Sequence, residues 1–340
     1  MLTTLAVVAL VAAGITALPG RRYQDRITGT GVTAALPNVD PTAGYDVMEP
    51  IPADLLNRNR LQLTDGRVFM LDGMGTVGGV WRVRDGWLAM SNETYESSVW
   101  FIQPSGARKL LATGARAVVS HGTKARPGPQ IAWSHDGQLS LATLDGDRLA
   151  DVATTDGIGH LFPVLVVGDG VMLGGTGASG SIAIWDMWFP DRGPYKPTPV
   201  TSDRISRVFG ATDDRIIALV DGCFTLVDPV GFTLDRTNCQ LHFGSDTSVY
   251  PSPDGSWWLI SSLDGVLLYD PVAIWASVDP VRRWVRHVLS LTWLDRTSIL
   301  MTTDDELIRV FTNDPGSLPT IALPGQRQGI KVVPDLRAWS

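Results

Sequence analysis

The chain has 340 residues, of which 44% are hydrophobic and 19% are charged, so it has ample apolar material for a folded core. Its net charge of −7 argues against nucleic-acid binding, which needs a basic surface, and it offers no polybasic patch for anionic lipids. Glu and Lys are scarce beside Asp, Arg, 35 Gly and 22 Pro, a balance that favours turn-rich β-structure over helices.

The first predicted element is a hydrophobic segment at residues 1–20, in which Leu2 to Leu18 is uncharged and mostly apolar. Two interpretations stay open: a secretory signal that is removed, or a membrane anchor that is retained. The n-region has no Lys or Arg, which weakens the first, and Arg21 and Arg22 directly follow the run. A buried core helix is a less favoured third interpretation. We expect the protein to be membrane-anchored with its folded domain outside the cytoplasm, or secreted, rather than cytoplasmic.

A linker is predicted next, at residues 21–57, because this stretch is rich in Pro, Gly and Ala and has no hydrophobic periodicity. A single folded domain is predicted over residues 58–340.

From about Leu61 onward, short apolar runs alternate with tight turns that recur about every 40 residues, a period typical of propeller blades. Two turns per repeat and a link to the next repeat predict four strands in each unit. The sequence therefore predicts an all-β protein, a β-propeller of four-stranded blades. The turns sit at the following pairs: Asp85-Gly86, Asp136-Gly137, Asp169-Gly170, Asp213-Asp214, Asp254-Gly255 and Asp295-Arg296.

Two segments resemble the strand-turn-strand signature of TolB-like and WD40-like propellers: WSHDG (133–137) and YPSPDGSWWLIS (250–261). The second copy is complete, whereas His135 replaces the proline in the first. The resemblance implies the propeller fold without indicating a subfamily. The Arg-, Ala-, Val- and Gly-rich composition also resembles that of proteins from high-GC bacteria such as actinobacteria.

The blade count rests on the two ends of the repeat region. Residues 330–340 start a seventh unit and end about two strands into it, while residues 61–73 precede the first full unit. We expect the N-terminal strands to complete this last blade, since such closure removes free sheet edges. Seven blades are thus predicted, with a six-bladed ring as the alternative.

The two cysteines, Cys223 and Cys239, flank a hairpin turn near Val230 and face each other across the ladder within about one residue. They are predicted to form a disulfide, which implies an oxidising compartment. A pair of reduced thiols is the alternative.

No motif predicts catalytic residues, a metal site or a cofactor, and no cofactor-binding residue can be identified. The glycine-rich stretches at residues 73–75 and 174–177 are interpreted as loops between strands. The histidines fall in different repeats, and Glu93 and Glu96 are interpreted as lying in a solvated loop.

The sequence therefore favours a monomeric, non-enzymatic binding or scaffold propeller at the cell envelope. Its ligand would be a protein, a peptide or a glycan, with no nucleic-acid partner and a membrane contact through the N-terminal segment. The alternative is an enzyme with its site at the channel mouth, namely a hydrolase, a lyase or a quinoprotein-type oxidoreductase. A purely structural module is a third, weaker possibility.

Overall fold

The structure is a computed structural model that describes residues 53–93, 96–176, 182–197, 204–244, 246–263, 265–276, 279–284, 288–303, 306–313, 320–322 and 330–339. All of them belong to one compact unit, residues 42–340. The predicted anchor or signal at residues 1–20 and most of the predicted linker lie outside the described residues. Within the described ranges, no helix has the length and apolar character needed to span a membrane.

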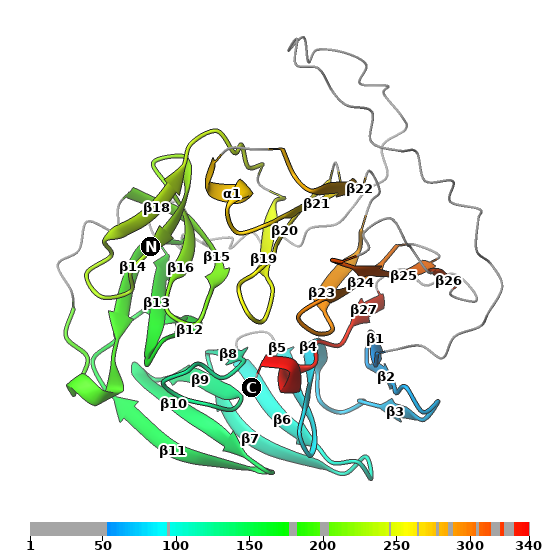
Figure 1. The fold of residues 1–340 in the computed structure, drawn as a ribbon. Helices are drawn as coiled ribbons and strands as arrows, with labels where there is room; N and C mark the ends of the chain where they lie inside the picture. Colours follow the sequence, from blue (N-terminus) through cyan, green and yellow to red (C-terminus); the bar gives the residue numbers. More distant parts are fainter. Residues whose placement is uncertain are drawn as a thin grey trace, which may run out of the picture. The chain divides into compact units, whose positions relative to one another are not determined.

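The described residues form seven antiparallel sheets, and the predicted β-propeller with seven blades is confirmed (Figure 1). We number blades 1 to 6 in chain order and call the seventh the closing blade. Six sheets have four strands, whereas blade 3 shows three in the part of the chain that the structure describes.

The first three blades comprise β4 (Thr76–Val83), β5 (Gly86–Glu93), β6 (Glu96–Ile102) and β7 (Arg108–Gly114); β8 (Arg116–Ser120), β9 (Gln130–His135), β10 (Gln138–Asp145) and β11 (Arg148–Thr155); and β12 (Phe162–Val167), β13 (Gly170–Thr176) and β14 (Ile182–Trp188).

The next three blades comprise β15 (Ile205–Ala211), β16 (Ile216–Val220), β17 (Cys223–Val227) and β18 (Leu234–Asn238); β19 (Ser248–Pro251), β20 (Trp258–Ser262), β21 (Gly265–Tyr269) and β22 (Arg282–Trp284); and β23 (Ser290–Trp293), β24 (Ser298–Thr302), β25 (Glu306–Phe311) and β26 (Thr320–Ala322). The short helices are η1 (Pro190–Arg192), α1 (Ala273–Ala276) and η3 (Leu336–Trp339).

The closing blade joins the two ends of the repeat region. Its strands, from the first to the last across the sheet, are β27 (Ile330–Val332), β1 (Leu55–Asn57), β2 (Arg60–Gln62) and β3 (Val68–Met70). β27 pairs antiparallel with β1, and Figure 1 shows the red C-terminal strand beside the blue N-terminal ones. The expected pairing of the two ends in one sheet is therefore confirmed, and the six-bladed alternative is wrong.

Two details of this blade differ from the prediction. The first strand begins at Leu55, within the segment predicted as linker. The sequence did not reveal this strand, because three residues are too few to show alternation of apolar and polar side chains. The C-terminal segment supplies one strand rather than two. Beyond β27 the chain turns to the edge of β4 that β5 leaves free, where the Arg82 amide donates a hydrogen bond to the Pro334 carbonyl at 2.8 Å.

A cluster of buried apolar side chains fills the space between every pair of neighbouring blades, including both pairs that involve the closing blade. On one side, Leu55 of β1 packs with Leu300 and Leu307 of blade 6. On the other side, Leu61 of β2 packs with Val77 of blade 1. Seven contacts between seven blades close the ring, and each fully buried leucine stabilises it by roughly 1.5 to 3 kcal/mol.

Candidate ligand groove

The candidate site begins at the hairpin between β1 and β2. Asn57 pairs with Arg60, which leaves Arg58 and Asn59 as the two turn residues. Arg58 has a φ of 53°, in the left-handed region that side chains other than Gly, Asn and Asp rarely adopt. The two-residue turns of blades 2 and 4 place Asp136 and Asp221 in the same conformation. Arginine has no local hydrogen bond to offset the cost, which is about 1 kcal/mol.

Asn59 fixes this hairpin to the loop between β3 and β4. Its side-chain Nδ2 donates a hydrogen bond to the Gly75 carbonyl at 2.9 Å, and its Oδ1 accepts one from the Val77 amide at 3.2 Å. The Leu71 amide donates to the Asn59 carbonyl at 2.7 Å. Hairpin and loop are therefore held together by one side chain and its own backbone.

The loop is the glycine-rich stretch at residues 73–75, and its interpretation as a connection between strands is confirmed. The same interpretation of the other glycine-rich stretch is wrong, because residues 174–176 belong to β13. Gly73 and Gly75 have φ values of 81° and 76°, which glycine adopts without strain. Between them, the Met74 side chain is only 2% exposed and anchors the loop in the core. At Gly75 a Cβ atom would approach the Glu93 side chain to within 3.0 Å, so the loop passes close to the hairpin between β5 and β6.

Hairpin and loop border an open surface groove of about 870 Å³, which we call the closure groove. It lies within the range of about 300 to 1,000 Å³ usual for ligand sites. Its walls carry two guanidinium groups, one carboxylate, an exposed methionine and a hydroxyl, from Asn57, Arg58, Asn59, Arg60, Met70, Asp72, Thr76 and Val77.

The charged groups of the groove are available for a ligand. Arg58 and Arg60 are both exposed. Within the described ranges, neither side chain makes an ion pair or a hydrogen bond. Among the described residues, Asp72 is engaged through its backbone carbonyl, which accepts a hydrogen bond from Arg108 Nη1, and its carboxylate makes no ion pair. Sequence analysis missed both arginines, because they fall at the edge of the predicted linker and carry no Asp-Gly turn signal.

Another cavity, of about 250 Å³, lies between blades 4 and 5, and Arg215, one of its two arginines, already has partners. Arg215 pairs with Asp214 at 3.3 Å, with Asp228 at 3.6 Å and with Asp235 at 3.3 Å. Its aromatic wall, Trp275, stacks on Phe224 with ring centroids 5.1 Å apart. These contacts assign Arg215 to charge balance and Trp275 to packing. The closure groove is also the larger of the two, so it is the better candidate.

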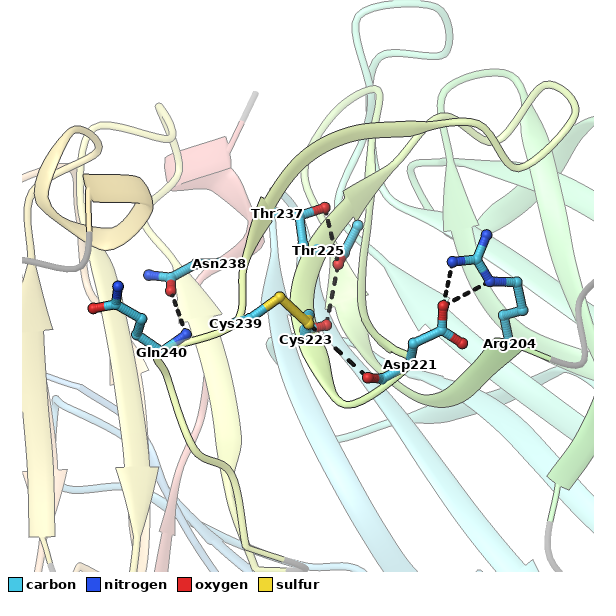
Figure 2. Close-up of a disulfide and its surroundings, with 8 residues drawn as sticks. All are labelled: Arg204, Asp221, Cys223, Thr225, Thr237, Asn238, Cys239 and Gln240. Carbon is cyan, nitrogen blue, oxygen red and sulfur yellow. Dashed lines mark hydrogen bonds and ion pairs between the residues drawn. A yellow bond between two sulfur atoms is a disulfide. The ribbon is translucent and has the colours of Figure 1, made fainter.

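Cys223 and Cys239 form the predicted disulfide, with their Cα atoms 4.2 Å apart (Figure 2). The two cysteines lie next to Phe224 and Asn238, which pair with each other between β17 and β18. Asn238 Nδ2 donates to the Ile274 carbonyl of α1 at 2.6 Å, and its Oδ1 accepts from the Gln240 amide at 2.8 Å. The disulfide thus fixes the end of β18 where blade 4 contacts blade 5, and it indicates an oxidising environment.

The four histidines that the structure describes do not converge. His121 is half-buried with Nδ1 2.8 Å from the Gly122 carbonyl, and burial lowers the pKa of its imidazole. His135, His160 and His242 are exposed, whereas His287 lies outside the described residues. Among the described residues, no three His, Cys, Asp or Glu side chains gather as metal ligands would.

The expectation that Glu93 and Glu96 lie in a loop is wrong. They end β5 and begin β6, where they face each other across the ladder, and both are exposed. The sequence between the two glutamates has no Asn-Gly or Asp-Gly pair, so it did not indicate a tight hairpin.

No protein-family model and no curated protein matches the chain. Among solved structures, apo AztD from Citrobacter koseri is 13% identical with a TM-score of 0.43, covering 83% of this chain and 96% of that chain. A crystal structure of Citrobacter koseri AztD is 14% identical with a TM-score of 0.44, covering 82% and 97% respectively. Values this low support no statement about ligand or activity.

Proposed function

We propose that the protein is a non-enzymatic binding propeller that works outside the cytoplasm and takes its ligand, a protein, peptide or glycan, in the closure groove. The observation that carries the proposal is that the guanidinium groups of Arg58 and Arg60 make no ion pair or side-chain hydrogen bond with any described residue. They stand on a hairpin that Asn59 holds to the loop at residues 73–75. Pre-formed walls reduce the ordering cost of binding. The disulfide supports the location, since such bonds persist in oxidising compartments.

Membrane attachment through residues 1–20, or secretion after their removal, belongs to the same proposal, as does a monomeric state. The relationship to TolB-like or WD40-like propellers is also proposed. In its support, Ser252 of the complete motif copy accepts a hydrogen bond from the Trp257 amide at 2.9 Å, and its Oγ donates to Asp254 at 2.8 Å. The motif residues thus build the turn between β19 and β20.

The test is to probe the full chain on peptide and glycan arrays, with an Arg60→Gln variant and an Arg148→Gln variant beside it. Arg148 is exposed in blade 2 and away from the groove, so it controls for the lost charge. We expect array ligands that the wild type and Arg148→Gln bind and that Arg60→Gln loses. Ligands that all three proteins bind equally, or an array ligand that is chemically converted, would contradict the proposal.

A further inference from the structure

From the geometry of the closure groove we infer that it is an oxyanion site in which Arg58 and Arg60 hold a carboxylate or phosphate group of the ligand. This inference rests on the proposed function and names the chemistry of the ligand.

The conformation of Arg58 is the first support. The turn needs a residue with positive φ at this place, and glycine, asparagine or aspartate would supply it without strain. Aspartate stands at the matching place in blades 2 and 4. An arginine here raises the free energy of the turn. Within the described ranges, its side chain forms no hydrogen bond or ion pair that would offset this cost. Strained residues with no local compensation point to a function.

The position of Arg60 is the second support. Arg60 pairs with Asn57 on β1 and with Met70 on β3, and directly opposed residues project from the same face of a sheet. Its side chain therefore projects from the same face as those of Asn57 and Met70, and Met70 is 54% exposed. Arginines in the turn and directly beside it offer the planar donor pairs that grip carboxylate and phosphate oxygens.

The local charge is the third support. The whole chain carries a net charge of −7, yet the groove residues include two arginines against the single carboxylate of Asp72. Arg108 binds the Asp72 carbonyl and brings a further positive charge to that wall. The Glu93 side chain lies near Gly75 and adds one carboxylate beside the loop. A locally basic groove on an acidic protein selects for an anionic group while the rest of the surface repels it.

The experiment measures binding of citrate, inorganic phosphate and glucose to the full chain by titration calorimetry, alongside urea unfolding of each variant. We expect citrate or phosphate to bind in a salt-sensitive way and glucose not to bind. Binding of citrate alone would assign a carboxylate, phosphate alone a phosphoryl group, and both the shared oxyanion chemistry.

Arg58→Gly is the decisive variant. We expect it to weaken anion binding at least tenfold while its urea midpoint stays equal or rises, because glycine relieves the positive φ. Arg60→Gln should weaken binding similarly, and Arg148→Gln should bind as the wild type does. A structural role for Arg58 would instead lower the urea midpoint of the glycine variant and would overturn the inference.

Unchanged anion binding in both groove variants, or no anion binding by the wild type, would also overturn it. If the arrays identify a neutral ligand that Arg60→Gln loses while citrate and phosphate fail to bind, the oxyanion assignment falls and the proposed function stands. If anions bind the groove but every array ligand binds elsewhere, the proposed function falls instead.

Discussion

At the scale of single residues, aspartates organise the turns through side-chain hydrogen bonds. Asp295 Oδ1 accepts hydrogen bonds from the Thr297 amide at 2.7 Å and the Ser298 amide at 2.8 Å. Its Oδ2 accepts one from the Ser298 hydroxyl at 2.6 Å, and Ser298 is fully buried. Such bonds shape the turn between β23 and β24 and explain why the sequence could place it.

Replacing this carboxylate gives the first prediction. Asp295→Ala should lower the free energy of unfolding by about 1 kcal/mol at pH 7, since it leaves the turn amides without their acceptor. Urea unfolding of the variant and the wild type measures the difference. Asp156→Ala serves as the comparison, since Asp156 is exposed and its carboxylate accepts one side-chain hydrogen bond, from Gln138, so it should change stability less.

The pH dependence of that difference follows from the same contacts. Burial acts to raise the pKa of Asp295, but the hydrogen bonds from Ser298 and Thr297 outweigh it and lower the pKa below 3.8. A lowered folded-state pKa gives stability that is present above pH 3.8 and is lost as pH falls through the folded-state value. The gap between wild type and Asp295→Ala should therefore shrink towards pH 2; a constant gap from pH 7 to pH 2 would contradict this.

At the scale of elements, the sequence predicted the hairpins better than their exact turn residues. Asp136-Gly137 forms the turn between β9 and β10 as predicted. In blade 1, however, Gly86 pairs with Val83, so the turn is Arg84-Asp85. A Cβ atom on Gly86 would come within 2.2 Å of the Ile102 carbonyl. Glycine is needed at position 86 because the neighbouring strand lies too close for a side chain, not because the backbone has a positive φ. An Asp-Gly pair in the sequence looks the same in both cases.

The disulfide gives the element-scale prediction. It closes a loop with a sequence separation of 16 residues, for which chain-entropy estimates give about 3 kcal/mol. A Cys223→Ser/Cys239→Ser double variant should lose about that much stability to urea unfolding.

A thiol titration of the denatured wild type, without reductant, provides the independent check. We expect no reactive thiol before reduction and two afterwards, since the chain holds two cysteines. Two reactive thiols before reduction would refute the disulfide and, with it, the support for an oxidising compartment.

At the scale of the whole molecule, a buried carboxylate ties the closing blade to blade 1. The Asp54 side chain has no solvent exposure. Its Oδ2 accepts a hydrogen bond from Trp87 Nε1 at 2.7 Å and pairs with Arg82 at 3.1 Å, and its Oδ1 accepts from the Thr64 amide at 2.8 Å. One residue therefore links the closing blade with the neighbouring blade at the point where the chain closes on itself.

Asp54→Ala should consequently destabilise the protein by about 3 kcal/mol, because it leaves buried donors without an acceptor. Asp65→Ala is the matched control, since Asp65 pairs with the exposed Arg67 in solvent and should contribute far less than Asp54. Urea unfolding of both variants measures the contrast. Equal effects would argue against a special role for Asp54 in ring closure.

The ring could be predicted from its repeat, whereas the closure groove could not. A period of about 40 residues survives changes in individual turns, so fold and blade count were readable. The groove instead depends on Arg58 and Asn59, in a hairpin whose strands are three residues long. The groove was identified from the positive φ of Arg58 and from the hydrogen bonds that Asn59 makes to Gly75 and Val77. Neither feature can be recognised in the sequence.

The central claim is that the chain's two ends share one blade, since both ring and groove depend on it. Asn57 and Ile330 oppose each other between β1 and β27, so cysteines there should lie about 4.5 to 5.5 Å apart at Cβ. We predict that an Asn57→Cys/Ile330→Cys variant oxidises to a linked peptide pair in mass spectrometry without reduction. Asn57→Cys with Arg148→Cys, in blade 2, should not. Absence of the first link, or equal formation of both, would contradict the closed ring.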